Sequence, residues 1–262
     1  MKKPQLALIY KDIRGITANR SLFLALLIVP LVMTVVVPSA LILTVALTPI
    51  DSPETQKLLN MISKGIFGEN LQILLIQLIL NNIVPLFFLL IPIMAATVMA
   101  ASSFVGEKEK RTLETLLYCP LSLKQIFYAK VFASFALSQF VSLVSFIAMV
   151  LVVQTEIWFV TGTFMLPGLN WLVLLLLVSP AVSLVAITMI VRGSAKAKSV
   201  EESQQRSVFL ILPILMLVVG QFTGIVMIDE LLLLGLGAVN AVAGMLLLRG
   251  SSANFNYERL IL

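Results

Sequence analysis

Residues 21–48 read SLFLALLIVPLVMTVVVPSALILTVALT, a run without a single charged side chain. A helix needs about 20 apolar residues to cross the hydrocarbon core of a bilayer, which is about 30 Å thick. This run is long enough to cross with a tilt, and Pro30 and Pro38 favour a bend within it. The stretch therefore predicts a membrane span rather than the core helix of a water-soluble domain.

The composition of the whole chain agrees with this prediction. Of the 262 residues, 60% are hydrophobic and only 12% are charged, too few to cover the surface of a soluble domain. We therefore predict an all-α integral membrane protein that forms one domain over residues 1–262. Six spans are expected, at about residues 21–48, 82–104, 131–153, 171–191, 207–228 and 231–248. For the last two, a re-entrant hairpin followed by one span remains an alternative.

Basic residues gather in alternate loops of this layout. Sixteen of the 18 Lys and Arg residues lie before the first span, after the second and fourth spans, or after the sixth, and only Lys57 and Lys64 fall elsewhere. Cationic loops stay in the cytoplasm, so both termini are expected inside, in the inner membrane of a bacterial or archaeal cell. The net charge of +5 then reflects topology, and no nucleic-acid partner is expected.

Two segments outside the spans carry helix signals. An amphipathic helix is expected over residues 4–19, lying on the cytoplasmic surface of the membrane. Its apolar face collects Leu6, Ile9, Tyr10, Ile13 and Ile16. Further along, Ser199 and Glu202 form a capping-box pattern that is expected to start the fifth span.

The predicted spans contain no Asp, Glu, Lys or Arg, and the chain has no histidine. An ion-coupled transporter usually needs an ionisable residue inside the membrane, although some Na⁺ sites use backbone and hydroxyl oxygens alone. There is also no phosphate-binding loop for a nucleotide, and Cys119 is a lone thiol with no catalytic arrangement around it. We therefore expect a non-enzymatic protein with no metal site and no cofactor of its own, and any uphill transport would be driven by a partner.

The long loop at residues 104–130, FVGEKEKRTLETLLYCPLSLKQIFYAK, is densely patterned. Three leucines at helical spacing predict a short helix with an apolar edge that ends before Pro120. Glu107 and Arg111 are spaced for an ion pair along the helix. Ser122 and Gln125 form a capping box that opens the helix of the third span. The apolar edge either packs on the membrane surface or is covered by a partner.

The run E-K-E-x-x-T-L-E-x-L-L-x-x-P-x-S in this loop, followed by Ala129 and Lys130, resembles the first cytoplasmic loop of ABC-2 type exporter permeases. Arg111 and Ala129 stand where glycine is usual in that family. The resemblance implies a second permease copy, identical or related, and a separate cytoplasmic ATPase that binds ATP and Mg²⁺ and docks on this loop. The residues implied in coupling to the ATPase are Glu107, Glu109, Leu113, Glu114, Leu116, Leu117 and Pro120.

The resemblance also implies a substrate path between the second and fifth spans. Its lining would draw on Asn81, Asn82, Phe88, Met94, Met216, Gln221 and Phe222, while Gly220 and Gly224 are candidates for a helix or dimer contact. An uncharged lining favours an apolar or amphipathic cargo, either a peptide or a drug-like molecule. Phenol-soluble modulin exporters and lantibiotic self-protection systems are compatible members of the class. The alternatives are an ion-coupled or Na⁺ efflux transporter or channel, and a membrane immunity protein that transports nothing.

Overall fold

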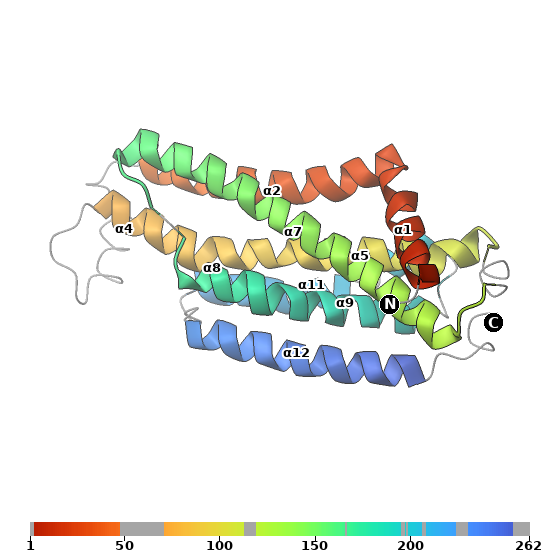
Figure 1. The fold of residues 1–262 in the computed structure, drawn as a ribbon. Helices are drawn as coiled ribbons and strands as arrows, with labels where there is room; N and C mark the ends of the chain where they lie inside the picture. Colours follow the sequence, from red (N-terminus) through yellow and green to blue (C-terminus); the bar gives the residue numbers. More distant parts are fainter. Residues whose placement is uncertain are drawn as a thin grey trace.

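The computed structural model describes residues 3–47, 71–112, 119–165, 167–194, 197, 199–205, 208–223 and 230–253. These residues form helices and short connections, with no strand among them, which confirms the all-α prediction. Most of the helices run side by side along one direction, and α1 lies across one end of the bundle (Figure 1). The helices are α1 (Lys3–Thr17), α2 (Arg20–Leu47), α4 (Leu71–Leu78), η1 (Ile79–Ile83), α5 (Val84–Glu109), α7 (Leu123–Thr161), α8 (Leu169–Val173), η2 (Leu174–Val178), α9 (Ser179–Ser194), α10 (Val200–Gln205), α11 (Val208–Phe222) and α12 (Glu230–Ala253).

Five helical stretches of the described residues are long and apolar enough to cross a membrane. They are Leu26–Leu47, Ile73–Glu109, Leu123–Thr161, Leu169–Ser194 and Glu230–Ala253. Each overlaps one predicted span, and most extend beyond it because the helix continues into polar residues at its ends. The predicted fifth span corresponds to α11, whose apolar part is shorter, and residues 224–229 lie outside the described residues. Six spans, and the alternative hairpin, therefore stay predictions.

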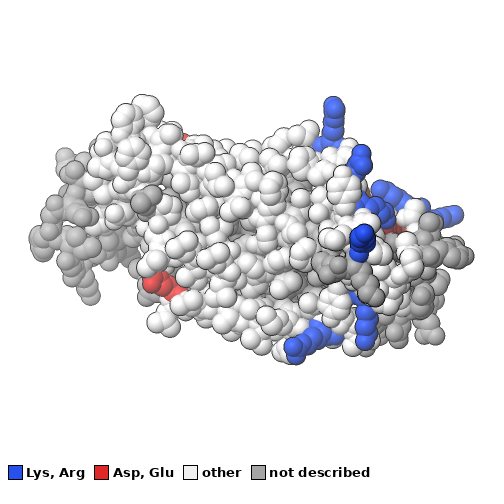
Figure 2. All heavy atoms as spheres, viewed as in Figure 1, with Lys and Arg blue, Asp and Glu red and all other residues white. Residues whose placement is uncertain are grey.

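Basic side chains gather at one end of the molecule (Figure 2). The described Lys and Arg residues belong to α1, the start of α2, the end of α5, the start of α7, and the last turns of α9 and α12. We call this the basic end. Here Arg192 of α9 donates to Ser251 Oγ at 2.9 Å and to Leu247 O at 3.2 Å, which joins the ends of α9 and α12. The grouping fits the predicted charge bias, while the orientation in the membrane stays a prediction.

The face that α1 buries differs from the predicted one. Ile9 and Ile16 are buried as expected, but Leu6 and Tyr10 are exposed, and Leu8 and Asp12 are buried in their place. The helix is thus rotated toward Asp12, because this carboxylate has partners inside the bundle. The bounds of α1, Lys3–Thr17, lie close to the expected 4–19.

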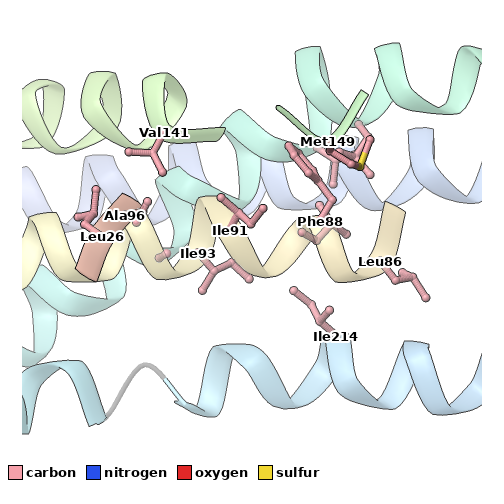
Figure 3. Close-up of a cluster of buried hydrophobic side chains, with 14 of the residues drawn as sticks. Leu26, Leu86, Phe88, Ile91, Ile93, Ala96, Val141, Met149 and Ile214 are labelled. Carbon is pink, nitrogen blue, oxygen red and sulfur yellow. The ribbon is translucent and has the colours of Figure 1, made fainter. Parts of the chain in front are cut away.

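The core is built around α5, which is buried along most of its length. Phe88 of α5, Phe146 of α7 and Trp171 of α8 form an aromatic group with ring centroids 5.3 to 6.1 Å apart. Figure 3 shows Phe88 with Ile91, Ile93 and other aliphatic side chains filling the space between neighbouring helices. Aromatic edge contacts of this kind add to the free energy of packing beyond the buried area.

Small residues let the outer helices approach this core. Four buried serines lie on α7: Ser134, Ser138, Ser142 and Ser145. Most of their hydroxyls donate to carbonyls of α7 itself, and their small side chains allow neighbouring helices to approach closely. On α12, a Cβ added at Gly237 would lie 2.8 Å from Leu177 Cγ, and one at Gly244 would lie 3.2 Å from Leu184 Cβ. Close contact between α12 and the segment η2–α9 therefore depends on these two glycines.

Candidate functional site

A cluster of charged side chains joins three helices at the basic end. Lys11 and Asp12 belong to α1, Ser103 and Glu107 to the last turns of α5, and Lys130 to the third turn of α7. Ser103 and Glu107 are four residues apart, so they lie on the same face of α5. We call these five residues the ionic cluster.

Lys130 lies at the centre of the ionic cluster, with only 3% of its side chain exposed. Its Nζ donates to Ser103 O at 2.6 Å and lies 3.5 Å from Asp12 Oδ2. It also lies 3.1 Å from Glu107 Oε2, close enough for an ion pair although the angles are not those of a hydrogen bond. Ser103 Oγ donates to Asp12 Oδ2 at 2.6 Å. A buried ammonium group is tolerated because two carboxylates and a carbonyl surround it.

Lys11 closes the ionic cluster on its solvent side. Its Nζ donates to Glu107 Oε1 at 2.5 Å, while more than half of the side chain remains exposed. Burial lowers the pKa of Lys11, but the hydrogen bond and charge of Glu107, with the charge of Asp12, outweigh it and raise the pKa above its ordinary value of 10.5. The ionic cluster thus combines two lysines with two carboxylates, whose formal charges sum to zero.

The last turn of α5 also holds α10. Glu109 Oε2 accepts from the backbone N–H of Val200, the first residue of α10, at 3.1 Å. Ser199 Oγ accepts from the N–H of Glu202 at 3.2 Å, as the predicted cap requires. The helix that it starts is α10, described as far as Gln205. Residues 206–207 lie outside the described residues, so the start of the fifth span at this cap stays a prediction.

In the loop after α5, one predicted side-chain interaction is absent and another is present. The Glu107–Arg111 pair is wrong, because α5 ends at Glu109, Arg111 has a left-handed φ of 55°, and Glu107 turns inward to two lysines. The Ser122–Gln125 capping box is confirmed at the start of α7. There, Ser122 Oγ accepts from Gln125 N at 3.3 Å, and Gln125 Oε1 accepts from Ser122 N at 3.0 Å.

A cavity of about 660 Å³ lies beside the ionic cluster, between α1, the end of α5 and residues 119–121. Leu8 and Ile16 form part of its apolar wall, and Lys11 and Glu107 lie at its polar side. Of the residues predicted to couple to an ATPase, Glu107 is buried, while Glu109 and Pro120 are exposed. The other four lie outside the described residues: Leu113, Glu114, Leu116 and Leu117.

The residues predicted to line a substrate path lie in different surroundings, and the path stays a prediction. Phe88 belongs to the aromatic core, Asn82 and Met94 are half-buried, and Met216 on α11 is exposed. Gln221 is half-buried, and its Oε1 is buried without a hydrogen-bond partner among the described residues. The side chain of Phe222, and Gly224, lie outside the described residues, and Gly220 is half-buried.

Asn81 joins two segments through hydrogen bonds. Pro85 has no N–H to donate to Asn81 O, and Asn170 Nδ2 approaches this carbonyl at 3.4 Å. Asn81 Oδ1 accepts from Gly168 N at 3.0 Å, and Trp171 Nε1 donates to Leu80 O at 3.1 Å. The π-helical turn η1 is thereby joined to the residues that open α8. Single π-helical turns within α-helices are often found at functional sites.

A cavity does lie between α5 and α11, but other residues line it. It measures about 140 Å³, and its walls include Leu89 and Ile93 of α5, Pro213 and Ile214 of α11, and Asn240 of α12. Among the described residues there is no group of three or more His, Cys, Asp or Glu side chains that could hold a metal ion.

The sequence analysis assigned a site role to Glu107 alone among the five residues of the ionic cluster, and it missed Lys11, Asp12, Ser103 and Lys130. A signal for Asp12 was present, because it is the one carboxylate in residues 1–20 and is flanked by Ile9 and Ile16 on the same side of the helix. Ser103 gives no comparable signal, since a hydroxyl in an apolar run is usual in membrane helices.

Comparison with known proteins gives one match. A family model described as ABC-2 family transporter protein matches residues 6–234, which is most of the chain. The searches of curated proteins and of solved structures found no match. Proteins of this family are membrane-spanning permease subunits of ABC transporters, work with an ATPase partner and are typically not catalytic themselves. The charged loop, the apolar helices and the family match agree, and the chain belongs to the ABC-2 family of transporter proteins.

Proposed function

We propose that this chain is the membrane-spanning subunit of an exporter whose energy comes from a separate ATPase docked on the loop after α5. The observation that carries the proposal is the ionic cluster. It ties the last turns of α5, where that loop begins, to α1 and α7 through Glu107 and Lys130. A force applied to the loop by a partner would therefore reach three helices at once.

The second carboxylate on the last turn of α5 extends this connection. Glu109 holds the first turn of α10, and α10 leads toward α11. Movement of the loop would thus also reach the helix that faces α5 across the 140 Å³ cavity. In this scheme Glu107 and Glu109 act within the permease, and the ATPase contacts fall to the residues between them and Pro120.

The cargo that fits best is apolar or amphipathic, a peptide or a drug-like molecule. The described walls of the cavity between α5 and α11 carry no charged side chain, and Asn240 is their polar group. A second permease copy, identical or related, would complete a path between the two subunits. Phenol-soluble modulin-like peptides are one suitable cargo.

An ion-coupled transporter or channel is the main alternative. The described charged side chains that are buried belong to the ionic cluster, at the basic end of the bundle, whereas a coupling-ion site is expected near the middle of the bilayer. A non-transporting immunity protein would use the same surface for binding without ATP turnover. The location of the buried charges at the basic end therefore favours an exporter coupled to an ATPase at that end over an ion-coupled transporter.

Co-purification with an ATPase tests the proposal. The chain is expressed with the P-loop ATPase encoded next to it, and the complex is purified through a tag on this chain. We expect a stable complex whose ATP turnover rises when an amphipathic peptide is added. A protein that binds no ATPase, or one that dissipates an ion gradient in vesicles without ATP, would contradict it.

Paired variants test the route of coupling. Changing Glu114→Ala together with Leu117→Ala removes the predicted docking contacts and is expected to abolish complex formation. Glu107→Gln is expected to leave the complex intact while peptide no longer raises ATP turnover, because the link to Lys130 is weakened. Glu201→Gln, at an exposed position of α10, is the matched control. Normal stimulation in Glu107→Gln would remove the ionic cluster from the coupling route.

A further inference from the structure

Three aromatic side chains stand out at the end of α7 opposite the basic end. Trp158, Phe159 and Phe164 are 48%, 80% and 72% exposed. They pack on one another, with the centroids of Trp158 and Phe159 5.4 Å apart and those of Trp158 and Phe164 6.4 Å apart. The planes of the second pair differ by only 26°. We call these three residues the terminal aromatic cluster.

The segment that carries Phe164 is held against α7 by its backbone. Gly162 ends α7 with a φ of 69°, which turns the chain back toward the helix. The side-chain amide of Gln154, oriented so that both of its polar atoms are satisfied, accepts from Met165 N at 2.9 Å and donates to Met165 O at 2.7 Å. Because Met165 is buried, Phe164 is held on the outside, against Trp158.

The distance along α7 places this cluster at a membrane boundary. Trp158 follows Lys130 by 28 residues on one unbroken helix, a rise of about 42 Å at 1.5 Å per residue. A bilayer with its headgroups is about 40–45 Å thick. No charged residue lies between Lys130 and Glu156, so the uncharged stretch ends within one turn of the aromatic side chains.

An exposed apolar row on α7 leads directly to the cluster. Phe140, Leu143, Ile147 and Leu151 are each at least half exposed, and their spacing of three and four residues places them on one face of the helix. Trp158 continues the same row two turns beyond Leu151. A face of this kind suits acyl chains along its length, and a tryptophan at its end suits the layer of carbonyl groups and headgroups, where an aromatic ring with one polar group is most stable.

We propose that the terminal aromatic cluster is a lipid-binding surface that inserts into the headgroup layer at the membrane face opposite the basic end, and so fixes the depth of α7. The rings are assembled against each other and held by the Gln154–Met165 contact, so insertion needs no rearrangement. Thr161 and Thr163 are next to these aromatic residues in the sequence, and we expect their hydroxyls to lie in the same headgroup layer.

The proposal can be tested with intrinsic fluorescence, because the chain has two tryptophans. Trp158 is exposed, whereas Trp171 is 1% exposed and its Nε1 is bonded to Leu80 O. The full chain and its Trp158→Phe variant are reconstituted in phosphatidylcholine–phosphatidylglycerol vesicles with bromine either near the carbonyl end or near the terminus of the acyl chain. The difference between the two proteins gives the emission of Trp158, and the variant gives that of Trp171.

We expect bromine near the carbonyl end to reduce the emission of Trp158 more than bromine near the chain terminus, and aqueous iodide to reduce it little. Emission from Trp171 should be insensitive to all three. Stronger quenching of Trp158 by the deep bromine, or by iodide, would overturn the proposed depth. Insensitivity of Trp158 to both lipids would mean that protein, such as a second copy, covers the cluster, and would overturn the proposal as well. A Trp171→Phe variant, which leaves Trp158 alone, repeats the measurement without subtraction.

Discussion

Lys130 of α7 and Glu107 of α5 meet with Nζ and Oε2 3.1 Å apart, and both side chains are almost fully buried. Neither charge would be stable there alone, since an isolated ion in a protein interior loses several kcal/mol of hydration free energy. The pair therefore restricts the relative movement of α5 and α7 as well as stabilising their contact. Any movement that separates α5 from α7 at this end must supply each charge with a new partner or with water.

Removing the central cation should destabilise the protein strongly. Lys130→Met leaves Asp12 and Glu107 buried without their shared partner, which we expect to lower the free energy of unfolding by about 3–5 kcal/mol. Thermal unfolding in detergent measures this loss. Lys124→Met, at an exposed position of the same helix, should have almost no effect. If Lys130→Met and Lys124→Met unfold together, the ionic cluster adds nothing to stability.

A hydroxyl also supports the cluster. Ser103 Oγ donates to Asp12 Oδ2 at 2.6 Å, and Ser103→Ala leaves that buried oxygen short of a donor, at a cost of about 1–3 kcal/mol. The neighbouring Ser102, which is half-buried, provides the control variant Ser102→Ala, for which a change within about 0.5 kcal/mol is expected. Equal losses in the two variants would show that the cost comes from the helix and not from the bond to Asp12.

The pH dependence of stability should report on Lys11. Because the pKa of Lys11 is raised in the folded protein, its contribution is fully present below the ordinary lysine pKa of 10.5 and is lost as pH rises through the raised value. Wild type should therefore be more stable than Lys11→Gln at pH 8, and the two melting temperatures should converge in strongly alkaline buffer. A gap that stays constant across the whole range would mean that the ion pair with Glu107 is not its cause.

Glycines on α12 offer a test of helix packing. Gly237→Ala places a Cβ 2.8 Å from Leu177 Cγ, and relieving such a clash in a packed interface costs about 1–3 kcal/mol. Gly235 lies on the same helix with nothing within 4 Å of an added Cβ, so Gly235→Ala should be neutral or stabilising by up to about 1 kcal/mol. The comparison is made by urea or thermal unfolding in one detergent. Equal destabilisation of both variants would place the close contact elsewhere.

Much of the fold could be predicted because the apolar runs mark the helices. Uncharged stretches such as residues 21–48 and 131–153 can lower their free energy only inside a bilayer or a core, and each overlaps a helix. The predicted ends of the helices were less accurate than the predicted apolar stretches. The second span was expected to end at Phe104, but α5 continues to Glu109 because Glu107 and Glu109 find partners within the protein.

The site was harder to predict because its contacts link distant positions. Sequence spacing offered Arg111 as the partner of Glu107, four residues away, whereas the structure pairs Glu107 with Lys11 and Lys130. Sequence spacing was also insufficient to locate the glycines that allow close helix packing. The spacing of Gly220 and Gly224 suggested a contact, but the tight packing that the structure describes lies at Gly237 and, one heptad later, Gly244. Local periodicity reveals which faces can pack, but not which helices will meet.

The length of α7 has a mechanical consequence. It is a single helix from Leu123 to Thr161 without proline or glycine inside it, closed by a capping box at one end and by Gly162 at the other. Lys130 holds it about 10 Å from its first residue and about 46 Å from its last, at 1.5 Å per residue. If Lys130 is the fulcrum of a rigid lever, a displacement of about 1 Å at the short arm becomes one of about 4 Å at the far tip. A small displacement at the basic end would thus be enlarged at the opposite end of α7.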